Sequence, residues 1–237
     1  MMTSFLPRDR GSKGLKTMQM QDQHPVKTSN ATKATVPGLR ARQKIARTER
    51  ILAGANHLFN TLGFEQTTMA TIAQSAEVST PTVFNYFKTK EELLLALVLQ
   101  VHHETRQQVR AFRPKARARA LDTICDFLAV YTQKSLESIN RKTWRHVEST
   151  RIRIPGSDFV KHYDALSAEM LTDFEGFLEL LFEERVKASR VIAKVMFNHW
   201  SALFMELIRD ETMTIESHAK QLREDLTALM GALNSAS

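Results

Sequence analysis

Apolar residues recur every three or four positions along most of this chain of 237 residues, a period that predicts α-helices. The first helix should begin near Arg42 and end at Gly63, because glycine is the residue that most often follows a helix. A long helix should run from Lys90 to about Phe112. Further amphipathic segments are expected at about 115–138, 140–152, 158–183, 185–210 and 214–233. Strand patterns are absent from the sequence, so we expect an all-α fold of about nine helices.

Residues 64–95 predict two short helices joined by a tight turn and followed by the long helix. Thr67 or Thr68 can cap the first short helix, and Ser79 can cap the second, with Pro81 in its first turn. The residues expected to face inward are Met69, Ile72, Ala73, Ala76, Val83, Phe84 and Phe87. Such a pair is typical of the helix-turn-helix arrangement, which places its second helix in the major groove of DNA.

The start of the long helix is marked by Thr89 and Glu92, which have the spacing of a capping box. The run from Leu93 to Leu99 is apolar on every side, so we expect it to be buried. Ser157 or Asp158 should cap a later helix, and Thr214 should begin the last one.

Three regions follow from these patterns. Residues 1–40 lack apolar periodicity and are expected to be a disordered basic arm. Residues 41–88 should form a helix-turn-helix domain, here called the head, and residues 89–237 a larger helical regulatory and dimerisation domain, here called the body.

Charge is distributed unevenly along the chain. The net charge is +7, and residues 1–48 contain ten Lys or Arg and two Asp, so the basic character belongs to the N-terminal arm. A solvated tail and a segment that contacts DNA phosphates or the minor groove are equally compatible with this arm.

Composition argues against several other classes of protein. Cys125 is a single cysteine, and the longest apolar run is far too short to span a bilayer, so we expect a cytoplasmic protein without a membrane partner. Eight glycines are too sparse for a phosphate-binding loop, and the histidines lack metal-ligand spacing. We therefore expect no enzyme activity, no catalytic residues, no metal and no cofactor.

Several spaced positions resemble the DNA-binding head of the TetR family of bacterial transcriptional regulators, over about residues 47–97. The positions that carry the resemblance are Gly63-Phe64, Thr67-Thr68, Ile72-Ala73, Val78-Ser79, Thr82 to Phe87 and Lys90 to Leu94. The resemblance implies a homodimeric repressor that leaves a palindromic operator when a small-molecule ligand binds. It also implies that helices four to seven enclose the ligand pocket and that the last two helices dimerise.

Two positions depart from the family pattern. Glu77 stands where a turn glycine is usual, so it must adopt a left-handed or otherwise adapted backbone conformation. Phe84 stands where the family often has Tyr, which removes one hydroxyl that would otherwise reach a phosphate.

The second short helix, Ser79 to Phe87, contains no Lys or Arg, so phosphate attraction must come from its flanks. Thr80, Pro81, Thr82 and Asn85 are the candidates for reading bases, and Tyr86 is the candidate for a phosphate contact. The full set of candidate DNA-binding residues is Arg42, Arg47, Thr68, Ser79, Thr80, Pro81, Thr82, Asn85, Tyr86, Lys88 and Lys90. Each of the polar residues of the helix could instead simply face solvent.

Aromatic residues of the body suggest a ligand pocket, although the same residues could be core. The candidate lining is Phe127, Tyr131, Trp144, Val147, Phe174, Phe177 and Phe197. The basic run from Arg141 to Arg153 fits either an anionic ligand or a solvated helix face. Wide apolar stripes near the C-terminus predict a dimer interface or, alternatively, core, and the interface candidates are Trp200, Phe204, Leu222, Leu226 and Leu229.

A second functional class stays open. The chain could anchor to DNA and recruit a partner as an architectural protein without sensing a ligand. An internal cavity in the body discriminates between the two, because a ligand sensor requires one.

Overall fold

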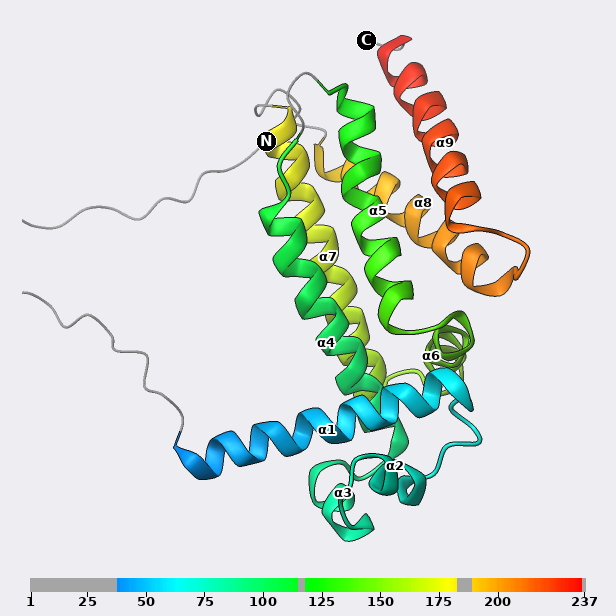
Figure 1. The fold of residues 1–237 in the computed structure, drawn as a ribbon. Coiled ribbons are helices and arrows are strands. Elements are labelled where there is room, and N and C mark those ends of the chain that lie inside the picture. Colours follow the sequence, from blue (N-terminus) through cyan, green and yellow to red (C-terminus); the bar gives the residue numbers. More distant parts are fainter. Residues whose placement is uncertain (1–37, 115–117, 183–188, 236–237) are drawn as a thin grey trace, which may run out of the picture. The chain divides into compact units, whose positions relative to one another are not determined.

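The structure, a computed structural model, describes residues 38–114, 118–182 and 189–235, and these residues form nine helices and no strand (Figure 1). The helices are α1 (Leu39–Thr61), α2 (Met69–Ser75), α3 (Thr80–Tyr86), α4 (Lys90–Ala111), α5 (Ala120–Ser138), α6 (Arg141–Arg153), α7 (Asp158–Leu181), α8 (Ser189–Arg209) and α9 (Ile215–Ser235). All nine lie in one compact unit, Leu39–Ser237. The all-α prediction is confirmed. The expected disordered arm lies mostly outside the described residues, but its last two residues, Leu39 and Arg40, belong to α1.

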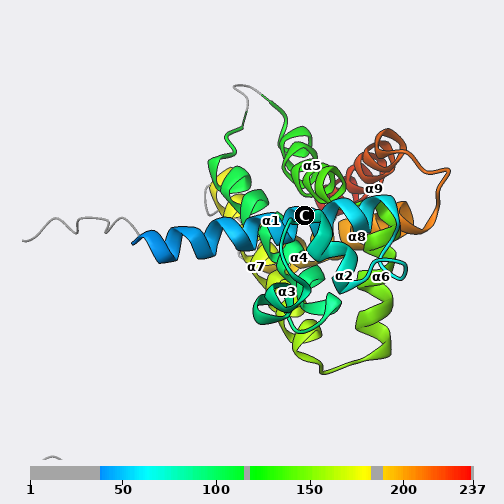
Figure 2. The ribbon, with the colours of Figure 1, turned by 60° about the horizontal axis from the view of Figure 1, so that its bottom comes forward.

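The head consists of α1, α2 and α3, and Figure 2 shows α2 and α3 beside the C-terminal half of α1. Each short helix buries one apolar side, with Ile72 of α2 and Val83 of α3 fully buried. Gly54 of α1 allows a close approach, because a Cβ at this position would lie 3.0 Å from the hydroxyl of Ser75 and 3.3 Å from the backbone nitrogen of Ala76.

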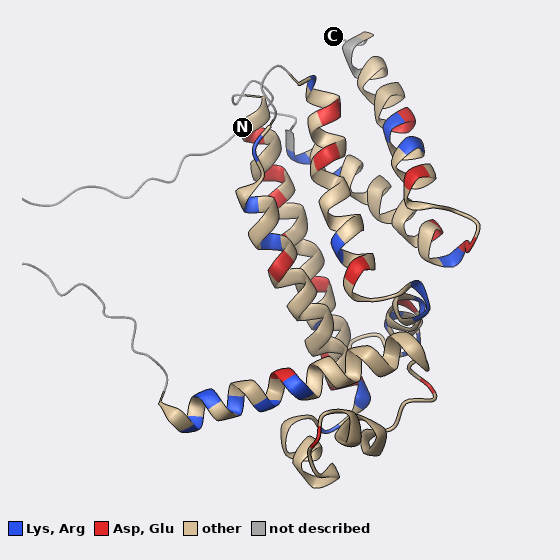
Figure 3. Cartoon of the chain, viewed as in Figure 1, with Lys and Arg blue, Asp and Glu red and all other residues tan. Residues whose placement is uncertain are grey.

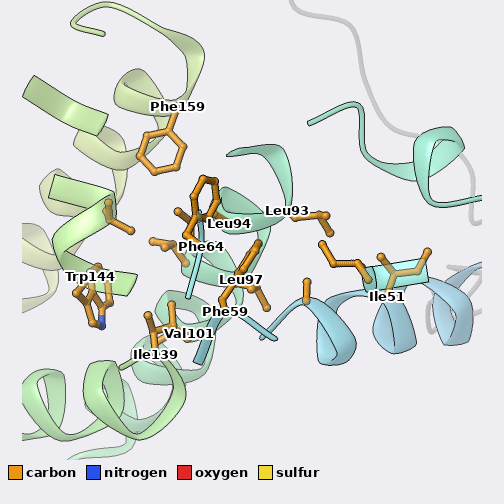
Figure 4. Packing of buried hydrophobic residues seen from close by; sticks show 14 of the residues in the cluster. Ile51, Phe59, Phe64, Leu93, Leu94, Leu97, Val101, Ile139, Trp144 and Phe159 are labelled. Atoms are coloured by element: carbon orange, nitrogen blue, oxygen red, sulfur yellow. The ribbon is translucent and has the colours of Figure 1, made fainter. Parts of the chain in front are cut away.

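Head and body share one apolar core. Leu93 and Leu94 at the start of α4 are fully buried against residues of α1 and α6, including Phe59 and Trp144 (Figure 4). The predicted burial of residues 93–99 is therefore confirmed for most of the run, and Leu99 is exposed. Because the core is continuous, a change in the body can reach the head through packed side chains.

Five helices of the body, α4, α5, α7, α8 and α9, pack around a second apolar cluster. In Figure 1, α4, α5 and α7 run side by side, and α8 packs against α6, α7 and α9. Within the described residues, α8 is long and apolar enough to cross a membrane by length and composition. One side of α8 is buried in the bundle, including Trp200 and Leu207, as in a core helix, so its composition is weak evidence for a membrane.

The predicted helix caps agree with the structure in most details. Thr68, Ser79 and Ser157 each accept a hydrogen bond from the backbone nitrogen three residues ahead. At α4 the hydroxyl of Thr89 accepts from the backbone nitrogen of Glu92, but the Glu92 carboxylate accepts from the backbone nitrogen of Lys88, at 2.6 Å. The capping box predicted there is therefore only half formed, because the return bond is made one residue earlier.

Candidate nucleic-acid interface and internal cavity

The turn between α2 and α3 holds the two short helices at a fixed angle. Glu77 has φ 55°, so it occupies the left-handed region that was expected at this position. The adjacent backbone nitrogens of Ala76 and Val78 donate to Ile72 and Ala73 at 2.9 and 3.0 Å. These hydrogen bonds give partners to the last backbone carbonyls of α2. They offset the cost of about 1 to 2 kcal/mol for a residue with a side chain in the left-handed conformation.

One face of α3 is open to solvent and carries Pro81, Phe84 and Asn85. The prediction that Phe84 faces inward is wrong, since 42% of it is exposed. Val83 and Phe87 occupy the inward side, and a residue next to Val83 points about 100° away from it. Phe84 is thus a candidate for base contact that the sequence pattern misassigned.

Other candidates on α3 are partly engaged within the helix. The hydroxyls of Ser79 and Thr82 lie 2.7 Å apart, and Ser79 accepts from the backbone nitrogen of Thr82 at 3.3 Å. Both residues hold the first turn of the helix. Thr80 and Tyr86 are half-buried, and Tyr86 packs partly against the core of the head.

The lysines that follow α3 are engaged within the head. Lys88 donates through Nζ to the carbonyl of Phe84 at 3.0 Å. Lys90 donates to the carbonyls of Phe64 and Glu65 at 2.8 and 3.4 Å, and its Nζ lies 4.6 Å from the centre of the Phe64 ring. A phosphate contact by either lysine would therefore replace bonds that hold the head together.

Free positive charge lies on α1 instead. Exposed cations follow its N-terminal half, shown in blue in Figure 3: Arg40, Arg42, Lys44, Arg47 and Arg50. The N-terminus of α2, capped by Thr68, has no acidic residue in its first turn, whereas the first turn of α4 contains Glu91 and Glu92. An anion is therefore better accommodated beside α1 and α2 than beside α4.

The body contains a cavity of about 260 Å³ between α4, α5, α6, α7 and α8. Trp144, Phe197, Trp200 and Phe204 contribute rings to its wall, and Tyr131 and Arg151 contribute polar groups. Among the described residues, no cluster of three His, Cys, Asp or Glu is placed to hold a metal ion. The aromatic rings of the wall suit the cavity to an organic molecule.

Residues 51–97 match the family model described as bacterial regulatory proteins, tetR family. The head of this chain is thus similar to the DNA-binding head of the TetR-family regulators. The match covers α2, α3 and the parts of α1 and α4 that pack on them. It includes the exposed face of α3, but the exposed cations of α1 from Arg40 to Arg50 precede it.

Solved structures share the fold of the TetR-family regulators over most of the chain. A putative TetR-family regulator from Mesorhizobium loti has 18% identity and a TM-score of 0.62, with 81% of this chain and 98% of that chain covered. One from Pectobacterium atrosepticum has 16% identity and a TM-score of 0.63, with 81% and 95% covered. The repressor FadR from Thermus thermophilus, in complex with lauroyl-CoA, has 20% identity and a TM-score of 0.55, with 77% and 93% covered.

No curated protein matches the sequence. The family match of the head and the shared fold support a DNA-binding transcriptional regulator.

Three of the predicted pocket residues line the cavity, namely Tyr131, Trp144 and Phe197. The other four do not, and their assignment is corrected. Phe127, Phe174 and Phe177 form an aromatic cluster in which Phe127 and Phe177 stack with ring centres 4.1 Å apart. Val147 belongs to the core shared by head and body. The wall also includes residues of α4, α7 and α8 that the aromatic criterion missed, because several of them are small or polar.

The predicted dimer residues are mostly interior. Trp200, Phe204, Leu222 and Leu226 are buried within the single chain, and Leu229 is half-buried. Their side chains support the packing of α8 and α9 and offer no surface to a second subunit, so the interface assignment of the first four is corrected. Each of α8 and α9 has one face in the interior and one at the surface, and the residues chosen from the sequence lie on the interior face.

Helix α6 joins the cavity to the TetR-family head. At its start, Asn140 donates from its backbone nitrogen to the side-chain oxygen of Asn60 at 2.9 Å and from its amide to the Asn60 carbonyl at 2.8 Å. Thr143 donates to the carbonyl of Phe59 at 3.2 Å. One turn later His146 lies against Phe64, and Trp144 and Arg151 of the same helix line the cavity. The sequence did not predict this contact between α6 and the head. The only local signal is that Asn140 is a residue type that often caps the start of a helix.

Proposed function

We propose that the chain is a homodimeric repressor that binds a palindromic operator through α3 and leaves it when a small molecule enters the body. The observation that carries the proposal is the cavity of about 260 Å³, whose wall includes residues of α4 and α6. Both helices also contact the head, α4 through the shared core and α6 through Asn60 and Phe64. A ligand that moves either helix would therefore reposition α3.

Contacts with DNA would divide between two parts of the head. The exposed residues Pro81, Phe84 and Asn85 of α3 are suited to base edges, since an apolar ring or aliphatic group can contact a thymine methyl and an amide can pair with adenine. Arg42 and Arg47 of α1 and the N-terminus of α2 at Thr68 are suited to phosphates. The partner is double-stranded DNA, which places this activity in the cytoplasm of a bacterium.

Homodimer formation is supported by an exposed stripe on α8 and a small-residue surface on α9. Val191 and Val195 are 70% and 47% exposed, and Ala202 continues the same side two turns later. Ala228 and Gly231 are exposed on α9, which packs against α8. Two such helix pairs related by a two-fold axis would form a four-helix interface.

Selection of bound DNA from a random library, followed by footprinting of the selected sequence, tests the proposal. We expect an inverted repeat with both half-sites protected, and an operator that overlaps a promoter. Protection of a single asymmetric half-site would contradict the dimer. Activation of the adjacent promoter would contradict the assignment as a repressor.

The alternative is a DNA-anchored partner-recruiting protein without a ligand. Ser201 lines the cavity, so Ser201→Phe should reduce the cavity volume and leave DNA binding intact. If no small molecule alters DNA binding by the wild-type protein, and the filled variant regulates in cells as the wild type does, the alternative stands.

A further inference from the structure

Two residues of the cavity wall each carry a buried hydrogen-bond donor that has no partner among the described residues. The donors are the hydroxyl of Tyr131, a residue only 1% exposed, and the Nε of Arg151. Burial raises the pKa of Tyr131, so the phenol stays protonated and can donate. Buried polar groups in native proteins nearly always have partners, and two unpaired donors in one cavity wall are therefore a sign of a ligand that accepts hydrogen bonds.

Three other donors of the wall already have hydrogen-bond partners within the protein. Thr105 donates to the carbonyl of Val101 at 2.7 Å, and Tyr163 donates to the carboxylate of Glu148 at 3.0 Å. The indole of Trp144 donates to the carbonyl of Ser135 at 2.9 Å. The two unpaired donors thus differ from these three groups, whose hydrogen bonds are made within the protein.

The positive charge of Arg151 is compensated by the protein. Its two terminal nitrogens bond the carboxylates of Glu148 and Asp164 at 2.8 and 3.3 Å. The guanidinium also lies over the ring of Tyr163, 4.4 Å from its centre. Two carboxylates beside one guanidinium leave no net positive charge to attract an anion.

His102, the other titratable cation of the wall, adds little positive charge. Burial lowers its pKa, and its Nε2 lies 3.1 Å from the carboxylate of Glu169. Arg106, behind it, pairs with Glu169 and Asp173. The wall therefore offers two hydrogen-bond donors, the Tyr131 hydroxyl and the Arg151 Nε, but no uncompensated positive charge.

Cavity size limits the ligand. A cavity of about 150 Å³ in another protein binds benzene, so the volume of about 260 Å³ here corresponds in proportion to about ten non-hydrogen atoms. The aromatic wall favours a ring system that stacks or packs edge-on against Trp144 and Trp200.

We propose that the cavity takes an uncharged one- or two-ring aromatic molecule with a hydrogen-bond acceptor such as a carbonyl, to which the Tyr131 hydroxyl and the Arg151 Nε donate. This ligand class rests on the proposed function for its biological meaning, but the binding itself is measured without DNA. It also separates this chain from the FadR of Thermus thermophilus, whose structure holds lauroyl-CoA.

Calorimetric titration of the full chain with three probes tests the proposal. The probes are 1-tetralone, tetralin, which has nearly the same ring system without the carbonyl, and 1-naphthoate, an anion of similar size. We expect 1-tetralone to bind at least about tenfold more tightly than either other probe, because hydrogen bonds contribute about five- to tenfold each and a buried anion lacks a free cation.

Tyr131→Phe supplies the residue-specific test. The affinity of the variant for 1-tetralone should be about five- to tenfold lower than that of the wild type, and its affinity for tetralin should be unchanged. Its unfolding temperature without ligand should equal or exceed that of the wild type, because the hydroxyl has no hydrogen-bond partner in the protein to lose. Equal affinity for 1-tetralone and tetralin, the same loss for both probes in the variant, or no binding of 1-tetralone would overturn the proposal. Tighter binding of 1-naphthoate would overturn it as well.

Failure of the ligand class and failure of the proposed function give different results. If 1-naphthoate binds and releases DNA while 1-tetralone does neither, the chain is a ligand-responsive regulator and the class is wrong. If 1-tetralone binds through Tyr131 but leaves DNA binding unchanged, the class is right and the release mechanism is wrong.

Discussion

The ring of Phe64 stacks on the imidazole of His146, with the ring centres 3.8 Å apart and the planes inclined by 24°. Phe64 belongs to the loop between α1 and α2, and His146 belongs to α6, so this pair connects the head to a helix of the cavity wall. Burial lowers the pKa of His146, which favours the uncharged ring at neutral pH. The carboxylate of Glu65 lies 3.3 Å from Nδ1 of the same imidazole.

His146→Ala should separate ligand binding from DNA release. Loss of the stack should lower the free energy of unfolding by about 1 to 2 kcal/mol and reduce the effect of a ligand on operator affinity. Operator affinity without ligand should change by no more than about twofold, because α3 is not touched. Operator binding by fluorescence anisotropy, with and without ligand, measures both quantities. His57→Ala, at an exposed position on α1, is the control, and an equal loss of response in both variants would contradict the role of His146.

Phe84→Ala should alter the sequence preference of the protein. If the exposed ring contacts a thymine methyl, its loss should cost about 1 kcal/mol at one base pair of each half-site and leave the slope of log affinity against log salt unchanged. Binding to a set of operators with single base changes measures this preference. A uniform loss of affinity across all sequences would show that Phe84 supports the fold of the head and reads no base.

Arg47→Ala should weaken binding to every DNA sequence. Each phosphate contact that is lost should reduce the magnitude of the salt slope by about 0.9. Lys220→Ala, an exposed cation on α9, is the matched control and should leave the slope unchanged. Identical slopes for the Arg47→Ala variant and the wild type would remove Arg47 from the interface.

Val195→Glu should convert the dimer to a monomer. A buried carboxylate without a cation partner is costly at an interface, and the variant subunit should stay folded because Val195 is exposed in the single chain. Light scattering coupled to size-exclusion chromatography gives the mass, and far-UV circular dichroism checks the helix content. Ile152→Glu, at another exposed apolar position, should leave the mass unchanged, and an unaltered mass for both variants would place the interface elsewhere.

Acid should destabilise the protein in part through His218. Burial lowers the pKa of His218 to about 4, and its Nε2 has no partner among the described residues. Since the unfolded chain binds this proton more readily, the stabilising contribution is present above about pH 6.5 and is lost as the pH falls toward 4, by at most about 3 kcal/mol. Urea unfolding from pH 7 to pH 4 should show a smaller decrease for His218→Leu than for the wild type. Parallel curves would show that other groups cause the acid sensitivity.

Local signals in the sequence located the helices well. The caps at Thr68, Ser79 and Ser157 were predictable because a hydroxyl at an N-cap needs only the next three residues to make its bond. At Glu77 the family resemblance implied a left-handed or otherwise adapted conformation, and the left-handed one is observed. Such caps and turns depend on only a few adjacent residues.

Tertiary structure decided what each helix face meets. Helical periodicity grouped Trp200 with Phe204 and Leu222 with Leu226, but it could not tell an interior face from a subunit interface, since both require apolar residues. Aromatic content likewise grouped Phe127 and Phe177 with Tyr131, although of these three only Tyr131 borders the cavity. Whether a buried hydroxyl has a partner depends on residues from other helices, so the free donor of Tyr131 and the neutralised charge of Arg151 became visible only when α5, α6 and α7 were in place.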